Sequence, residues 1–345
     1  MALKRMNQKM INRSKKFKDI YADIGIISLN LHESALLRNA TANKKYIEHS
    51  LRDITKSLSS CAIVISAGPS IHKKNSIKKI RDSKFNGVII AVDGSYISCI
   101  KEGLIPDYLL TLDPHPSRIV RWFGDPDFEL NSVNDDYFSR QDLDVSFRNN
   151  ASEENSLNIK LIDQYAKHSD LVICSSSPEN VVSRVHEAGF KKVFWWNPLV
   201  DDPNLPESLT KKLFSINGLP CMNTGGNVGT AACVFASTIL GIKRVAMVGM
   251  DFGYYLDLPY SQTQKYYELL ERLGGDLSNL ESHFPKGVYP QTGETFYTDA
   301  TYLWYKNNFT DLLQFSTSKF YNCTEGGMLY GKGIDCIPLQ KFLKD

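Results

Sequence analysis

The sequence predicts an α/β protein: a Rossmann-like, mostly parallel sheet with helices on both faces, a helical N-terminal extension and an aromatic C-terminal lid segment. Short, almost continuously apolar runs recur from Cys61 onward, as strands buried on both faces require, and helical or polar segments separate them. The runs are CAIVIS (61–66), GVIIAV (87–92), DYLLTL (107–112), DLVICS (170–175), KVFWWN (192–197) and RVAMVG (244–249).

The regions around these runs divide the chain into three parts. Residues 1–58 have helical patterning, including residues 44–58, and no convincing strand, and their basic first 20 residues are expected to form a solvated helix or arm. Residues 59–255 hold the sheet, with one additional strand expected at DVSF (144–147). The Tyr-rich residues 256–345 are expected to form a lid or acceptor segment, whose helix and final strand, FYNCTEGG, complete the same domain.

The composition limits the partners. Lys and Arg number 40 against 38 Asp and Glu, and a net charge of +2 gives no electrostatic reason to expect a nucleic acid. No apolar run approaches the roughly 20 residues of a membrane span, and the N-terminus lacks the apolar core of a signal peptide. We therefore expect a cytoplasmic protein, with peripheral membrane contact and homo-oligomerisation left open.

The cysteines and histidines show no metal-binding pattern. Each residue type occurs seven times, and the chain contains no CxxC pair or HxxxH spacing. We expect reduced, mostly buried thiols and predict no metal site.

The residues after each run form a candidate ligand site. In an open parallel sheet, ligands collect outside the carboxyl ends of the strands. Small, hydroxyl or acidic residues recur there, in a pattern that suits a phosphate-bearing ligand such as a nucleotide. The candidates are Gly68, Pro69 and Ser70 after the first run, Asp93 after the second, Asp113 after the third, Ser175 and Ser176 after the fourth, and Asp251 after the sixth.

The stretch NTGGNVGTAACVFASTILG (223–241) adds a second kind of anion site. A helix start offers unpaired backbone N–H groups, and glycines allow a phosphate to approach them closely. We therefore add Asn223, Thr224, Gly225 and Gly226 to the candidates. Ordinary turns and helix caps explain many such residues equally well, including Asp93 and the serines. Neither GxGxxG nor the P-loop motif occurs.

Transfer from a nucleotide carrier also needs a group that deprotonates or orients the acceptor hydroxyl. The residues that could do so are His115, His283, Glu294 and Asp299. No single one of them has a distinguishing pattern.

Six motifs in order resemble the family of 6-hydroxymethylpterin diphosphokinase-like domains, which also contains the motility-associated flagellin glycosyltransferases. The resemblance covers roughly Cys61 to Ile337. The motifs are ISAGPSI, VIIAVDGS, GLIPDYLLTLDPH, NTGGNVGTAACVFASTILGIKRVAMVGMDFGY, FYTDATYLWYKNNF and FYNCTEGGMLYGKGI. Residues 225–254, within the fourth motif, are also similar to the corresponding part of bacterial sialyltransferases of glycosyltransferase family 42.

The sialyltransferase resemblance implies roles for individual residues. It implies nucleotide contacts from Gly68, Pro69 and Ser70 and from residues 224–226. Setting TGETFYTD (292–299) against the segment that carries the sialyltransferases' catalytic His places Glu294 at that position, so the base assignment stays open between Glu294 and His283. Tyr297 is expected to contact the departing phosphate, and Asp299 closes the same segment.

Three functions follow from these resemblances. The first is a glycosyltransferase that moves a nonulosonic acid, such as sialic, pseudaminic or legionaminic acid, from a CMP-linked donor to a carbohydrate or protein hydroxyl. The alternative is an ATP-dependent 6-hydroxymethylpterin pyrophosphokinase, which implies Mg²⁺ near Asp113 and Asp251. The third is a nucleotide-binding protein without turnover.

Overall fold

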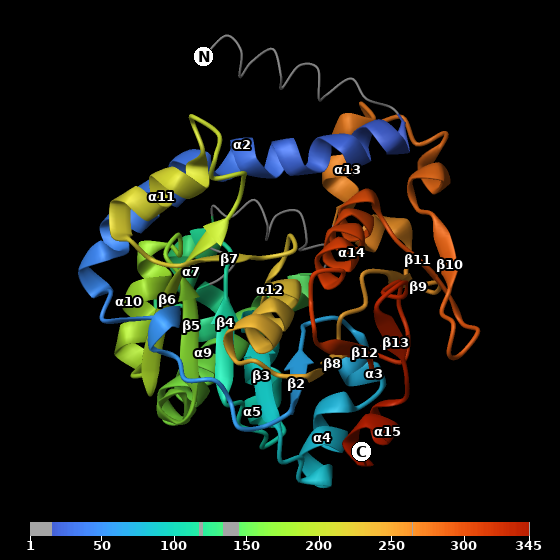
Figure 1. Ribbon diagram of the computed structural model, residues 1–345. Coiled ribbons are helices and arrows are strands. Elements are labelled where there is room, and N and C mark those ends of the chain that lie inside the picture. The colour runs from blue at the N-terminus through green and yellow to red at the C-terminus, as the bar shows by residue number, and fades with distance from the viewer. Residues whose placement is uncertain (1–15, 117–119, 134–144, 264, 345) are drawn as a thin grey trace.

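The computed structural model describes residues 16–116, 120–133, 145–263 and 265–344 and contains a ten-stranded sheet with helices packed around it (Figure 1). Residues 1–15 of the expected basic arm lie outside the described part. The sheet order is β1-β6-β5-β4-β3-β2-β8-β12-β13, with β7 paired to β6, and every pair is parallel. The strands are β1 (His49–Ser50), β2 (Cys61–Ile65), β3 (Val88–Val92), β4 (Tyr108–Thr111), β5 (Asp170–Cys174), β6 (Lys192–Leu199), β7 (Cys221–Asn223), β8 (Arg244–Val248), β12 (Lys319–Asn322) and β13 (Ile334–Cys336).

The sheet has a topological switch point between β2 and β8. From β2 the chain builds outward through β3, β4, β5 and β6, and it then returns to place β8 on the other side of β2. In open parallel sheets, ligands bind outside the carboxyl ends of the strands at such a switch point. The carboxyl ends of β2 and β8 are therefore where a ligand site is expected.

Side chains alternate between two cores on opposite faces of the sheet. In β2, Ile63 and Ile65 point into one core, and Ala62 and Val64 point into the other. The predicted apolar runs are strands because both of their faces are buried. The mostly parallel α/β class is confirmed.

Helices cover both faces. The first core packs against α4 (Ser76–Ser83), α5 (Asp93–Lys101), α9 (Val145–Tyr165), α10 (Glu179–Ala188) and α15 (Leu339–Lys344). The second packs against α12 (Val228–Val234), its π-helical continuation Phe235–Ile239, and α14 (Ala300–Leu313). The other helices are α2 (Phe17–Asn43), α3 (Ser70–Lys73), α7 (Phe128–Val133), α11 (Leu209–Asn217) and α13 (Tyr266–Arg272).

Helix α2 crosses above the sheet from α11 to α14 (Figure 1). Its C-terminal half is fixed by amides: Asn39 donates to the carbonyl of Ser176 at 2.9 Å, and Asn43 donates to those of Ser175 and Ser177 at 2.9 and 2.7 Å. Its N-terminal half contacts α14, where Asn307 donates to the Tyr21 hydroxyl at 2.8 Å. The helix therefore spans the carboxyl edge of the sheet. No helix in the described ranges is long and apolar enough to cross a membrane.

The Tyr-rich region forms a small antiparallel sheet and an aromatic layer. Strands β9 (Tyr254–Tyr255), β11 (Thr295–Tyr297) and β10 (Lys286–Val288) pair in the order β10-β11-β9. Tyr254, Tyr260 and Phe284 surround the Tyr297 ring at centroid distances of 5.2, 5.1 and 5.6 Å. This region then supplies β12 and β13 to the main sheet.

Two local predictions were wrong. DVSF was expected to be a strand. Asp144 lies outside the described residues, but Val145 begins helix α9, which buries Ile162 in the first core. Residues 44–58 were expected to be helical, but they contain 3₁₀ turns at Lys44–Tyr46 and Leu51–Asp53 and the short strand β1. A Ser50–Asp53 capping box stabilises the N-terminal end of the second turn.

Candidate functional site

The turn after β2 packs directly on the turn after β8. The Gly68 amide donates to the carbonyl of Gly249 at 2.8 Å, and the Ser70 hydroxyl donates to Asp251 Oδ2 at 2.7 Å. A Cβ on residue 68 would lie 2.0 Å from Asp251 Oδ2 and 2.5 Å from the Gly249 carbonyl oxygen, so only glycine fits. Pro69 caps the short helix α3 and is followed by Ser70. The structure thus brings Gly68, Pro69, Ser70 and Asp251 together at the switch point.

Three buried polar atoms around this switch point have no hydrogen-bond partner among the residues that the structure describes. They are Ser66 Oγ, Asp251 Oδ1 and Asn227 Nδ2. The glycine at the start of α12 brings two of these residues close, because a Cβ on Gly229 would lie 2.6 Å from Ser66 Oγ and 3.2 Å from Asn227 Oδ1. An unsatisfied buried polar group costs about 1–3 kcal/mol, so each of these atoms is a candidate for a hydrogen bond to a polar ligand.

Burial changes the acidity of two carboxyl groups at this edge. Desolvation raises the pKa of Asp251 to about 6, against the opposing effect of the hydrogen bond from Ser70. Desolvation likewise raises the pKa of Asp93 to about 7, against hydrogen bonds from Thr111 and the Gly94 amide. Both groups therefore titrate near neutral pH, as groups in functional sites often do.

Asp113 follows β4 and its negative charge is a further, smaller cause of the raised Asp93 pKa. Its Oδ1 accepts a 2.8 Å hydrogen bond from the backbone N–H of His115. The half-buried Asp113 thus lies at the carboxyl edge as expected and closes a local turn.

The glycine-rich turn differs from the expected anion site. Helix α12 begins at Val228 and not near Asn223, which ends β7. Side chains already occupy the amides: Gly225 donates to Asn223 Oδ1 at 3.0 Å, Gly226 donates to Thr224 Oγ1 at 3.1 Å, and Gly229 and Thr230 donate to Asn227 Oδ1. A phosphate would have to displace these acceptors.

The glycines themselves have a packing reason. Gly225 and Gly226 have φ values of +61° and +101°, which favour glycine. A Cβ on Gly226 would lie 2.6 Å from the Trp304 ring of α14. The turn that precedes α12 therefore packs against α14. Its role in nucleotide binding stays a prediction.

Ser175 and Ser176 are fully buried beneath α2. The Ser175 hydroxyl donates to Asn197 Oδ1 at 2.6 Å, and the Ser176 hydroxyl lies 2.9 Å from Cys174 Sγ. The backbone carbonyls of the two serines accept hydrogen bonds from the side-chain amides of Asn43 and Asn39. Helix α2 covers both serines, and their turn anchors this helix. Their nucleotide contacts stay a prediction.

Of the four catalytic candidates Tyr297, Asp299, His283 and Glu294, only His283 and Asp299 line the same pocket. Tyr297 is buried, and its hydroxyl donates a hydrogen bond to the Leu258 carbonyl at 2.6 Å. The same O–H group therefore cannot donate to a phosphate. Asp299 caps α14 by accepting from the Tyr302 amide, and its other oxygen accepts from the Tyr254 hydroxyl, both at 2.8 Å. His283 is 3% exposed and lines a separate pocket with Asp299.

Glu294 is exposed and precedes β11. It lies close enough to Tyr255 to raise the pKa of that phenol, although desolvation is the largest cause and Asp251 contributes more than Glu294. Glu294 and Asp251 therefore flank the same tyrosine. Within the described residues, no group of three or more His, Cys, Asp or Glu side chains could hold a metal ion.

Sequence reasoning did not select Ser66, Asn227, Lys265 or Arg272. Ser66 and Asn227 stand beside the motifs that it did select, so their position next to a strand end or glycine turn was the available signal. Lys265 and Arg272 line the separate pocket, which four segments of the chain form, and no local pattern marks them.

Comparisons with known proteins match this fold. Residues 34–132 match the family described as 6-hydroxymethylpterin diphosphokinase MptE-like. An uncharacterized protein of Treponema pallidum (strain Nichols) is 34% identical over 105 residues, which cover 29% of this chain and 47% of that protein. The structure of MAf glycosyltransferase from Magnetospirillum magneticum AMB-1 has a TM-score of 0.56 and 16% identity, over 89% of this chain and 38% of that one. The chain thus spans less than half the length of either relative.

Proposed function

We propose that this protein is a glycosyltransferase, because residues 34–132 match the family described as 6-hydroxymethylpterin diphosphokinase MptE-like and because the fold is similar to that of the MAf glycosyltransferase. The family segment contains the Gly68 turn, Asp93 and Asp113, so it includes much of the switch-point edge. The proposed donor is a CMP-linked nonulosonic acid. The proposed acceptor is a hydroxyl of a carbohydrate or protein.

The observation that supports the proposal most is the unsatisfied polar cluster at the β2–β8 switch point. Ser66 Oγ and Asn227 Nδ2 can donate hydrogen bonds to phosphate oxygens, and Asp251 Oδ1 can accept one from a ribose or base group. The crevice outside the carboxyl ends of strands is where nucleotides bind in such sheets. A nucleotide would satisfy donors and acceptor together.

In the proposed reaction, the acceptor oxygen forms a bond to the anomeric carbon, while the bond from that carbon to the CMP phosphate oxygen breaks. CMP leaves with the electron pair, and the acceptor hydroxyl loses its proton. Donors fixed around the phosphate stabilise the charge that develops on it. Glu294 stays our proposed proton acceptor, because it is exposed and because, like Asp251, it lies close enough to Tyr255 to raise the pKa of that phenol.

Ligand-dependent thermal stability tests the nucleotide. We expect CMP to raise the melting temperature without added metal, because a ligand that binds only the native state stabilises it. Stabilisation by ATP with Mg²⁺ alone would instead support the pyrophosphokinase alternative, which the family description favours. Binding of CMP without turnover of any CMP-sugar would support the non-catalytic alternative. The absence of any nucleotide effect would refute all three.

The variant Ser66→Ala tests the location. The Ser66 hydroxyl has no described intrachain partner, so its removal should leave the melting temperature of the free protein unchanged or slightly higher. The loss of one ligand hydrogen bond should weaken CMP binding about fivefold. The matched control is Ser177→Ala, which removes an equally buried and unpartnered hydroxyl after β5 and should not affect CMP. Equal CMP affinities in both variants would place the nucleotide elsewhere.

A further inference from the structure

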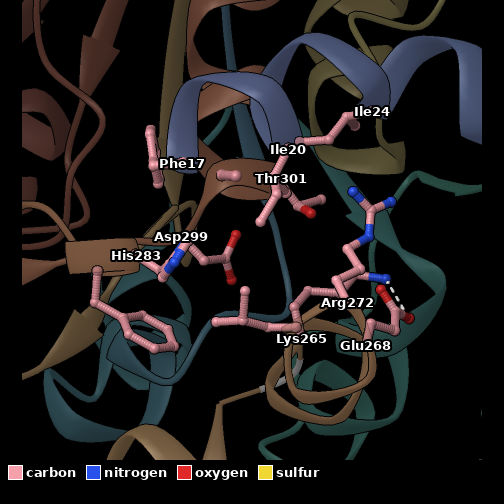
Figure 2. Close-up of a pocket in the computed structure, with 12 residues that line it drawn as sticks. Phe17, Ile20, Ile24, Lys265, Glu268, Arg272, His283, Asp299 and Thr301 are labelled. Atoms are coloured by element: carbon pink, nitrogen blue, oxygen red, sulfur yellow. Dashed lines mark hydrogen bonds and ion pairs between the residues drawn. The ribbon is translucent and has the colours of Figure 1, made fainter. Parts of the chain in front are cut away.

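A separate pocket lies where helix α2 meets α13 and the start of α14 (Figure 2). Its volume is about 50 Å³, several times the roughly 10–15 Å³ that one water needs. Phe17, Ile20 and Ile24 of α2 give it an apolar wall, and Phe284 also lines it. The lining does not include Ser66, Asn227 or Asp251, so the pocket is a different site from the switch point.

Two buried polar atoms in this pocket have no hydrogen-bond partner among the described residues: Arg272 Nη1 and His283 Nδ1. The His283 side chain is 3% exposed, and burial lowers the pKa of its imidazole, which favours the neutral ring. Figure 2 shows His283 beside the Asp299 carboxylate on one side of the pocket, and the Arg272 guanidinium on the other side, reaching towards α2. A ligand that satisfies both therefore needs two separate polar groups.

Among the charged side chains of the pocket lining, Arg272 is the cation that a ligand could contact directly. Lys265 is paired with Glu268 at 3.0 Å, and the Asp299 oxygens already accept from Tyr302 and Tyr254. Asp23, Glu268 and Glu271 act on Arg272 only through space, and desolvation lowers its pKa. An anion that hydrogen-bonds the guanidinium directly would offset this desolvation.

We propose that this pocket binds a hydroxy acid, with the carboxylate on Arg272, a hydroxyl on His283, and the carbon skeleton against the apolar wall of α2. A neutral imidazole suits a hydroxyl because its nitrogen can donate to, or accept from, the same group. A carboxylate suits Arg272 because the guanidinium fork matches its two oxygens. The inference goes beyond the proposed function and does not depend on it, because the pocket is a different site from the proposed nucleotide site.

The test is titration calorimetry on the full chain at pH 7 with three matched small molecules. Lactate and propionate differ by one hydroxyl, and propionate and propionamide differ by the charge. We expect affinity to fall in the order lactate, propionate, propionamide. Saturable binding of lactate, with affinities in this order, supports the proposal.

Variants locate the binding. Arg272→Gln should weaken lactate at least tenfold, and Arg272→Lys, which keeps the charge, should weaken it less. His283→Phe should abolish the preference for lactate over propionate while leaving propionate bound. The control is Lys286→Gln, which removes a positive charge that is paired with Glu281 outside the pocket. The proposal is overturned if no acid binds saturably, if propionamide binds as tightly as propionate, or if Arg272→Gln and Lys286→Gln bind lactate alike.

Discussion

The contact between residue 68 and Asp251 sets the chemistry of the switch point. Because Gly68 lacks a Cβ, the Asp251 carboxyl can pack against the backbone of the preceding turn, away from water. The burial that results, 4% exposure, is what raises its pKa to about 6. The absence of a Cβ at Gly68 thus allows the burial that raises the pKa of Asp251.

The raised pKa of Asp251 makes stability depend on pH. Its value of about 6 in the folded protein exceeds the ordinary 3.8, so the unfolded chain ionises first as pH rises. The contribution to stability is complete below pH 3.8 and is lost as pH rises through 6. Asp93 adds the same trend up to about 7.

The variant Asp251→Asn removes the first of these two contributions. Relative to wild type, it should gain stability between pH 4 and pH 7, by on the order of 2–3 kcal/mol. Urea unfolding of both proteins at several pH values measures this. Parallel pH profiles would show that Asp251 ionises in the folded protein as it does in the unfolded chain.

At the scale of elements, helix α2 depends on a few polar contacts with strands far along the chain. Asn43 is 1% exposed and its amide satisfies two carbonyls of the turn after β5, at 2.9 and 2.7 Å. These bonds span more than 130 residues of sequence. They hold the helix across the carboxyl edge, where it covers Ser175 and Ser176.

Replacing Asn43 by Ala should destabilise the protein by about 2 kcal/mol, because two buried carbonyls lose their donor. Thr41→Ala, on the same helix, removes only an exposed hydroxyl that donates to Leu37, and it should change the free energy of unfolding by less than about 0.5 kcal/mol. Chemical denaturation compares the two variants. Similar losses would mean that the Asn43 contacts do not anchor the helix.

The strands predicted from the six apolar runs share one physical property: both of their faces are buried, so apolar side chains follow one another almost without interruption. Strands β1, β7 and β13 contain two or three residues, and too few residues alternate or cluster in them to give a signal. Strand ends predicted that Gly68, Ser70 and Asp251 lie together, because parallel strands align their carboxyl ends. The sequence could not predict that a distant helix covers Ser175 and Ser176 at another strand end.

At the scale of the whole molecule, the double-sided burial of the sheet also protects its thiols. Cys99, Cys174, Cys233 and Cys323 are buried, Cys61 and Cys336 are partly buried, and Cys221 is exposed. Desolvation raises the pKa of the Cys174 thiol to about 11 and raises the others of the buried group further. Thiolates, which are the reactive species, are therefore rare in the core.

Thiol labelling of the folded chain should modify Cys221 first. The four buried cysteines should react only as the protein unfolds, so their labelling rate should rise with denaturant together with the loss of native structure. Peptide mass spectrometry after timed alkylation identifies each site. Early modification of Cys174 or Cys233 under native conditions would show that the layers over the sheet open without global unfolding.

The long reach of helix α2 also matters while the polypeptide is being made. Asn43 leaves the ribosome more than 130 residues before the turn that it binds, and Tyr21 precedes its partner Asn307 by 286 residues. At about 5–20 residues per second, the helix waits many seconds for its docking surfaces. In nascent chains of this protein, helix α2 should therefore stay undocked throughout most of translation. During that time it is available to a chaperone at the ribosomal exit.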